Sequence, residues 1–267
     1  MDIPKLGFGT YKLKGKILYD VLNNALALGY RHIDTASLYR NEEIIGNVLM
    51  ENKIKREEIF LTTKISLKDI KKGKNGILNS IEKSLKKLQV EYIDLLLFHA
   101  PIDDLNIINI NWKLLEEICM NHIPKLKDKI KNIGVSNYNI NHLQSILNDC
   151  KIKPFCNQIE ISPFLTRDNL VSFCNQNNIK IIAHSSLTKG TKFNDNKLMN
   201  LSIKYNLNIP LLLLCWAKYK NFILIPRTSN IDHVLQNLDC LKINLSTEAI
   251  KELDELNENY STHPKFI

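Results

Sequence analysis

Short apolar runs alternate along this chain with longer stretches in which apolar residues recur every third or fourth position. The runs are almost continuously apolar, as expected of strands that are buried on both faces of a parallel sheet. We expect eight such strands, at residues 6–10, 31–36, 59–65, 94–100, 131–137, 155–161, 179–186 and 222–228.

The stretches between these runs have the periodicity of amphipathic helices. The clearest covers residues 77–88, where lysines fill one face and the other carries Ile77, Ile81, Leu85 and Leu88. Residues 17–28 and 143–147 behave similarly, and a last helix is expected at 246–257, opening with Ser246. Pro124 should kink or break the helical segment 112–131, because proline removes a helix hydrogen bond.

Alternating strands and helices predict a parallel sheet. Eight such units in 267 residues favour a closed (β/α)8 TIM barrel over an open sheet, as one domain spanning residues 1–267. No composition shift marks a linker within it.

Polar residues stand where three consecutive predicted strands end. Asp34, Lys64 and His99 each follow an apolar run, and Tyr39 lies on the loop just after Asp34. In a parallel barrel the strand C-termini open onto one face, so these side chains should converge there. An acid, a phenol, an amine and an imidazole could together protonate a carbonyl oxygen while a hydride reaches its carbon.

Each of these four residues has a structural interpretation when it is taken alone. Asp34 could be a cap or an ion-pair partner, His99 a core histidine and Tyr39 a packing residue. Taken together, they predict that Lys64 lowers the pKa of the Tyr39 phenol and that Asp34 holds Lys64 charged. The hydride must come from a bound nicotinamide, because no side chain supplies one.

Composition limits the other functional classes. The formal net charge of +8 could suggest nucleic-acid binding, but the lysines are scattered and aromatic residues do not interleave with them, so a solvated basic surface is the better interpretation. The six cysteines contain no CxxC pair, so we expect neither a metal site nor a disulfide framework. With no signal pattern at residues 1–4 and no apolar run of membrane-spanning length, we expect a cytoplasmic protein.

Seven ordered motifs resemble the aldo-keto reductase superfamily, particularly its small members of the prostaglandin F synthase or 2,5-diketo-gluconate reductase type. They are LGFGTY (6–11), GYRHIDTASLYRNEEIIG (29–46), FLTTK (60–64), LLFHAP (96–101), IGVSNY (133–138), NQIEISPF (157–164) and IPRTSN (225–230). The resemblance implies a (β/α)8 barrel that reduces carbonyl compounds with NADPH, often as a monomer. It places the family's catalytic tetrad on Asp34, Tyr39, Lys64 and His99.

The resemblance also implies a binding site for NADP(H), with NAD(H) as the alternative. Ser136, Asn137 and Gln158 match the residues that bind the nicotinamide carboxamide, and Ser185 and Leu187 match those that hold the pyrophosphate. Arg227 and Thr228 fall where the adenosine 2′-phosphate is bound. The remaining positions matched to the cofactor are Gly9, Thr10, Asp34, His184, Ser229, His233, Gln236 and Asn237.

The chain departs from the family pattern at three positions. His184 replaces the tyrosine that stacks on the nicotinamide, so cofactor affinity should change between about pH 5.5 and 7.5, where histidine titrates. His233 replaces an arginine, which weakens the preference for NADPH. Ala100 replaces a tryptophan, and with the short C-terminal tail it suggests an open substrate pocket, for which Tyr11 and Trp112 are candidate walls. Packing at the start of a helix is an equally good interpretation of Trp112.

Two functions follow from the resemblance. The first is reduction of small aldehydes or ketones to alcohols, with Tyr39 as the general acid and a small-molecule carbonyl compound as substrate. The second is a non-catalytic cofactor-binding regulatory or structural module, in which His184, His233 and Ala100 mark a loss of catalysis. The sequence does not identify the physiological substrate.

Overall fold

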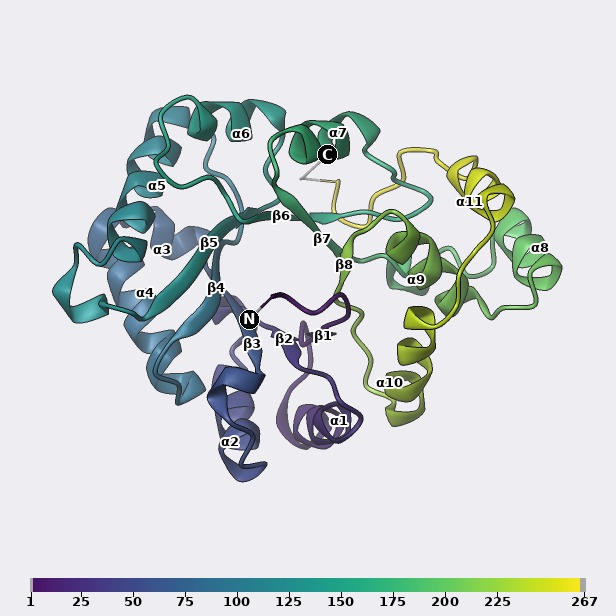
Figure 1. Ribbon diagram of the computed structural model, residues 1–267, viewed down its shortest axis with the longest axis horizontal. Coiled ribbons are helices and arrows are strands. Elements are labelled where there is room, and N and C mark those ends of the chain that lie inside the picture. The colour runs from purple at the N-terminus through teal and green to yellow at the C-terminus, as the bar shows by residue number, and fades with distance from the viewer. Residues whose placement is uncertain (1, 265–267) are drawn as a thin grey trace.

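The computed structural model describes residues 2–264 and contains one parallel sheet whose strands follow the order of the sequence. Its outer helices surround the strands (Figure 1). The strands are β1 (Phe8–Gly9), β2 (His32–Asp34), β3 (Phe60–Ile65), β4 (Ile93–Phe98), β5 (Ile130–Ser136), β6 (Cys156–Glu160), β7 (Lys180–His184) and β8 (Ile223–Leu224).

Helices connect consecutive strands, as a (β/α)8 barrel requires. Within residues 2–264 they are α1 (Gly15–Ala27), α2 (Glu42–Glu51), α3 (Leu67–Ile70), α4 (Gly73–Leu88), α5 (Leu105–Cys119), α6 (Ile140–Leu147), α7 (Asp168–Gln176), α8 (Asn196–Lys204), α9 (Ile209–Tyr219), α10 (Ile231–Leu238) and α11 (Thr247–Asp254). Short 3-10 helices are η1 (Ser37–Tyr39), η2 (Arg56–Glu58), η3 (Pro124–Leu126), η4 (Thr188–Gly190) and η5 (Asp239–Leu241).

Backbone hydrogen bonds close the barrel between its first and last strands. Gly7 N donates to Leu224 O at 2.7 Å, and Gly9 N donates to Pro226 O at 3.0 Å. A Cβ at position 9 would lie 2.6 Å from Ile225 O, so only glycine allows this approach. β1 and β8 are both shorter than predicted. Pro226 has no backbone N–H, so it cannot extend the hydrogen bonds of β8.

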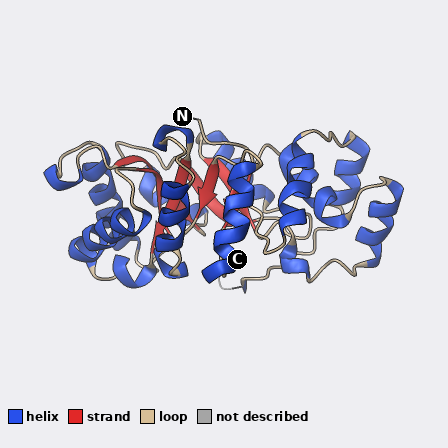
Figure 2. Cartoon of the chain, turned by 90° about the horizontal axis from the view of Figure 1, so that it is seen from below, coloured by secondary structure: helices blue, strands red, loops and turns tan. Residues whose placement is uncertain are grey.

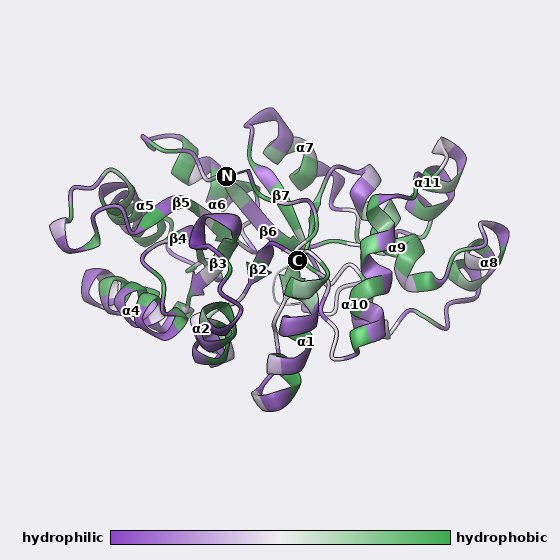
Figure 3. Ribbon diagram, turned by 60° about the horizontal axis from the view of Figure 1, so that its bottom comes forward, coloured by the Kyte–Doolittle hydropathy of each residue, from purple (hydrophilic) through white to green (hydrophobic). Residues whose placement is uncertain are grey.

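Alternate residues along the strands face two different cores. In β4, Leu95 and Leu97 pack inside the barrel with Ile182, whereas Leu96 and Phe98 face the surrounding helices. Figure 2 shows the strands enclosed by helices, and in Figure 3 the outer helices carry both hydrophilic and hydrophobic residues. The outer helices therefore cover a barrel whose interior is filled with side chains.

The predicted fold and all eight strands are confirmed, and the differences lie in the lengths of strands and in the helix boundaries. α5 begins at Leu105, where the Asp104 side chain accepts hydrogen bonds from two backbone N–H groups, and it ends before Pro124. Ser246 caps α11 by accepting from Ala249 N at 3.1 Å. Within residues 2–264 no single helix is long and apolar enough to cross a membrane; α8 and α9 meet the criterion only as a pair bent by 83°.

Candidate active site

A buried ion pair joins the ends of β2 and β3. Lys64 Nζ lies 2.5 Å from Asp34 Oδ1 and also donates a hydrogen bond to Thr35 O at 2.9 Å. Only 1% of Lys64 and 2% of Asp34 are exposed. Burial lowers the pKa of Lys64, and the Asp34 carboxylate opposes that effect. A buried pair persists only when both charges are compensated in this way.

Tyr39 lies above this ion pair on the turn η1. Its ring centroid is 5.2 Å from Lys64 Nζ, 5.6 Å from the His99 ring and 5.1 Å from the Tyr11 ring. The structure thus brings the four predicted catalytic residues together, and it places Tyr11, a predicted pocket wall, directly beside them.

The expected net lowering of the Tyr39 pKa by Lys64 is not found. Burial raises the pKa of the Tyr39 phenol well above its usual value, and the Asp34 carboxylate and Tyr11 add to the effect. The charge of Lys64 is offset by Asp34, and its amine donates to Asp34 Oδ1 and Thr35 O. Tyr39 is therefore protonated at neutral pH, so its phenol carries the proton that a general acid needs.

His99 is a neutral imidazole at the end of β4. Burial, together with the nearby Lys64 charge, lowers its pKa to about 3. Its Nδ1 is buried without a hydrogen-bond partner among residues 2–264. A neutral imidazole beside a phenol can donate a hydrogen bond to the same acceptor oxygen.

The residues matched to the nicotinamide carboxamide adjoin the catalytic group. Gln158 Nε2 donates to Asp34 Oδ2 at 2.7 Å, and Ser136 Oγ donates to Gln158 O at 2.9 Å. Asn137 Nδ2 donates to His99 O at 3.1 Å. All three side chains thus lie at the same end of the barrel as the tetrad.

His184 ends β7 next to Asn137. Its Nε2 lies 3.1 Å from Asn137 Oδ1 and its Nδ1 lies 3.1 Å from Ser185 Oγ. Burial lowers the pKa of His184 to about 3, although the Glu160 carboxylate opposes the shift. The structure therefore contradicts the expected titration between about pH 5.5 and 7.5, because the imidazole is already neutral there.

The C-terminal tail returns to this face of the barrel and is held by Glu160. The carboxylate accepts hydrogen bonds from Ser261 Oγ at 2.6 Å, from Thr262 N at 2.8 Å and from His263 N at 3.1 Å. The His263 ring centroid lies 5.7 Å from that of His184. The tail, although short, thus contacts His184, the residue matched to the nicotinamide, and the open substrate pocket beside Ala100 stays a prediction.

The residues matched to the adenosine phosphate follow β8. Arg227 is exposed, and its Nε donates to Tyr11 O at 3.1 Å. Thr228 is buried, with Oγ1 3.4 Å from His233 Nδ1. Ser229, His233 and Gln236 are exposed and Asn237 is buried, on the segment that leads into and through α10.

The remaining residues predicted for the site are Thr10, Ala100, Leu187 and Trp112. Thr10 Oγ1 donates to Asp34 O at 2.9 Å, and Ala100 is buried directly after His99. Leu187 packs against the outer core. Trp112 does not reach the site: its ring packs against Phe98, which faces the outer helices, and its Nε1 donates to Ile152 O at 3.1 Å. Its position inside α5 therefore contradicts a role as a pocket wall.

Comparison with known proteins assigns this arrangement to a family. The model of the aldo/keto reductase family matches residues 5–258. The chain belongs to the aldo/keto reductase family. It is 34% identical to glyoxal reductase of Bacillus subtilis over 99% of this chain and 92% of that protein. It is 30% identical to a methylglyoxal reductase of Escherichia coli strain K12, over 98% and 92% of the two chains.

A solved structure has the same fold as this aldo/keto reductase. The enzyme comes from a deep-sea metagenome library of the Medee basin and is described as an aldo-keto reductase. It superimposes with a TM-score of 0.90 at 31% identity, covering 98% of this chain and 94% of the other.

Sequence analysis missed two parts of the site of this aldo/keto reductase. Glu160 lies within the motif NQIE, but an acid at a strand end gives no sign that it binds a segment one hundred residues later. Asn41 was also overlooked: its buried amide donates to Thr10 O at 2.9 Å and to Leu13 O at 3.1 Å, which fixes the loop after β1. Its position in the motif LYRNEE, directly after Tyr39 and Arg40, was the signal in the sequence that could have pointed to it.

Proposed function

We propose that this protein reduces small aldehydes or ketones to alcohols with NADPH, and that Tyr39 is the proton donor. The observation that carries the proposal is the arrangement of Tyr39 and His99 above the buried Lys64–Asp34 pair, with ring centroids 5.6 Å apart. Membership of the aldo/keto reductase family and the names of the relatives, glyoxal reductase and methylglyoxal reductase, support carbonyl reduction.

The residues of this site fit a nicotinamide dinucleotide. Amide groups of Asn137 and Gln158 lie beside the tetrad and suit a carboxamide. Ser186 Oγ, at the end of β7, is buried without a partner among the described residues 2–264, and a pyrophosphate oxygen could satisfy it. Arg227, exposed and with no carboxylate within 4.0 Å in that part of the chain, suits the 2′-phosphate of NADPH.

The proposed reaction divides the work among the four residues. The bound nicotinamide would supply the hydride. His99, as a neutral donor, would orient the carbonyl oxygen, and Tyr39 Oη would transfer its proton to that oxygen. The phenolate that remains would be stabilised by the Lys64 ammonium, and it would recover a proton from solvent. Asp34 would keep Lys64 charged throughout.

Consumption of NADPH tests this proposal directly. The purified protein is mixed with NADPH and either methylglyoxal or 4-nitrobenzaldehyde, and the near-ultraviolet absorbance of the reduced cofactor is followed. We expect many turnovers per protein molecule with at least one of the two aldehydes. Cofactor binding without turnover of either aldehyde would contradict the proposal.

A non-catalytic cofactor-binding module is the second candidate, and one observation favours it. His184, which stands in place of the family's stacking tyrosine, contacts His263 of the tail with ring centroids 5.7 Å apart, so the chain departs from the family pattern beside the proposed nicotinamide site. The same assay separates the two candidates, because a module would bind NADPH, shown by quenching of protein fluorescence, and would consume none.

A further inference from the structure

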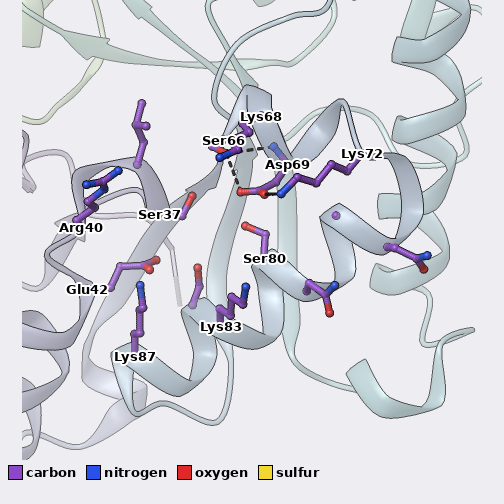
Figure 4. A pocket seen from close by; sticks show the side chains of 15 residues that line it. Ser37, Arg40, Glu42, Ser66, Lys68, Asp69, Lys72, Ser80, Lys83 and Lys87 are labelled. Atoms are coloured by element: carbon purple, nitrogen blue, oxygen red, sulfur yellow. Dashed lines mark hydrogen bonds and ion pairs between the residues drawn. The ribbon is translucent and has the colours of Figure 1, made fainter.

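A polar cavity of about 330 Å³ lies outside the proposed active site, between the turn η1, the end of β3 and the helices α3 and α4. Figure 4 shows its lining side chains, which come from all of these elements. Its wall includes Ser37 and Arg40, which flank Tyr39 in the chain. Its volume is at the lower end of the range for small-molecule sites, about 300–1,000 Å³.

Positive charge dominates this cavity. Its lining contains five cations, Arg40, Lys68, Lys72, Lys83 and Lys87, and two carboxylates, Glu42 and Asp69. Lys72 lies 3.0 Å from Asp69. The other four cations have no carboxylate within 4.0 Å in the part of the chain that the structure describes.

Both carboxylates in the wall already have partners. Glu42 is 2% exposed and accepts a hydrogen bond from Thr63 Oγ1 at 2.7 Å; burial raises its pKa, and this hydrogen bond and the Lys87 charge oppose the shift. Asp69 accepts from Ser66 Oγ at 2.7 Å and pairs with Lys72. The charges of Lys87 and Lys83 also act on Glu42 and Asp69, but the five cations still outnumber the two carboxylates.

Helix α4 presents one continuous polar face to the cavity. Asn75, Asn79, Lys83 and Lys87 follow one another at intervals of four, so they lie in one row along the helix. The neighbouring row is Gly76, Ser80 and Ser84, and both serines are buried. A Cβ at Gly76 would lie 2.2 Å from Asp69 O, so glycine is needed to bring α4 this close to α3.

We propose that this cavity binds a small polyanion, a molecule with two or more phosphate or carboxylate groups. Unpaired cations, hydroxyl groups and side-chain amides are the donors that such oxyanions need. The site is distinct from the predicted cofactor phosphate segment at Arg227, which lies beside α10, away from α3 and α4 (Figure 1). A bound anion would touch Arg40, the residue that follows Tyr39, so the cavity adjoins the turn that carries the proposed acid.

Calorimetric titration with inorganic pyrophosphate at constant ionic strength tests the site. We expect saturable binding to the wild type, and a loss of affinity of about tenfold or more in the double variant Lys83→Ala/Lys87→Ala, because two of the cations that would contact the anion are removed. Lys83→Arg/Lys87→Arg should retain binding. All four substitutions are at exposed positions.

The matched control removes two other exposed lysines that form no ion pair within residues 2–264, Lys197→Ala/Lys251→Ala, and should bind within about twofold of the wild type. Arg227→Ala should also bind as the wild type does. No saturable binding to the wild type, an equal loss in both double variants, or a loss only in Arg227→Ala would each overturn the proposal. None of these readouts requires that the protein be a reductase.

Discussion

Gln158 and Asp34, which lie 124 residues apart in the chain, are joined by a hydrogen bond of 2.7 Å at the centre of the site. Lys64 takes the other oxygen of the same carboxylate at 2.5 Å. The carboxylate is thus held from β6 and from β3 at once. An amide that the family resemblance assigns to the cofactor also orients the Asp34–Lys64 pair in this structure.

This arrangement predicts that removing one charge of the buried Asp34–Lys64 pair destabilises the fold more than replacing both charges by neutral side chains. Lys64→Met leaves the Asp34 carboxylate buried without its cation, and we expect a loss of about 3–5 kcal/mol in the free energy of unfolding. The double variant Asp34→Asn/Lys64→Met should lose less than Lys64→Met alone. Denaturant unfolding measures both; a double variant at least as unstable as Lys64→Met would contradict the prediction.

Buried neutral histidines predict that stability falls in mild acid. Burial lowers the pKa of His32 to about 3, whereas an unfolded chain binds this proton near pH 6.5. The stabilisation is therefore complete above about pH 6.5 and is lost as the pH falls towards 3. Between about pH 6.5 and 5.5 the loss in the free energy of unfolding is about 1 kcal/mol.

His99 and His184 have pKa values lowered to about 3 and act in the same direction. Unfolding at several pH values should therefore show a shallower dependence for His32→Gln than for the wild type. The exposed His122→Gln variant is the control and should follow the wild type. An unchanged slope in His32→Gln would contradict this reading of the buried imidazole.

Glu160 predicts a specific effect on the tail. Glu160→Ala removes the acceptor of the Thr262 and His263 amides, which donate to it at 2.8 and 3.1 Å. Hydrogen exchange at these two amides should become about tenfold faster or more, since removal of such a bond costs about 1.5 kcal/mol. Glu255→Ala, at an exposed position, should leave their exchange unchanged. Equal protection in Glu160→Ala would mean that other contacts hold the tail.

Arg227 should set the preference between the two cofactors. If its guanidinium binds the 2′-phosphate, Arg227→Ala should weaken NADPH binding about tenfold or more and leave NADH binding nearly unchanged. Fluorescence titration with each cofactor measures this. An equal loss for both would show that the residue supports the loop through its bond to Tyr11 O, 3.1 Å away.

The sequence predicted the features of the fold that depend on the apolar runs of the strands and on their order along the chain. The convergence of Asp34, Lys64 and His99 follows from parallel topology, because each ends a neighbouring strand. The pKa of Tyr39 could not be predicted, since its direction depends on burial and on how far Asp34 offsets Lys64. Trp112 was misplaced because the start of its helix was missed, although Asp104 offered a capping signal.

The contact of the tail with β6 was also beyond the sequence. Ser261, Thr262 and His263 are polar residues without periodicity, and their position depends on a single carboxylate, Glu160. The same limit applies to the cavity beside α4: the lysines of residues 77–88 were expected to face solvent, and only the packing of α3 against Gly76 turns part of that face into a wall.

The central claim is that Tyr39 is the proton donor of a carbonyl reductase, and Tyr39→Phe tests it most directly. The steady-state rate of NADPH consumption with methylglyoxal is compared with that of the wild type, alongside NADPH binding by fluorescence titration. We predict a rate about 10²–10⁴-fold lower, the usual contribution of a general acid, with cofactor affinity unchanged. Undiminished turnover in Tyr39→Phe would contradict the claim.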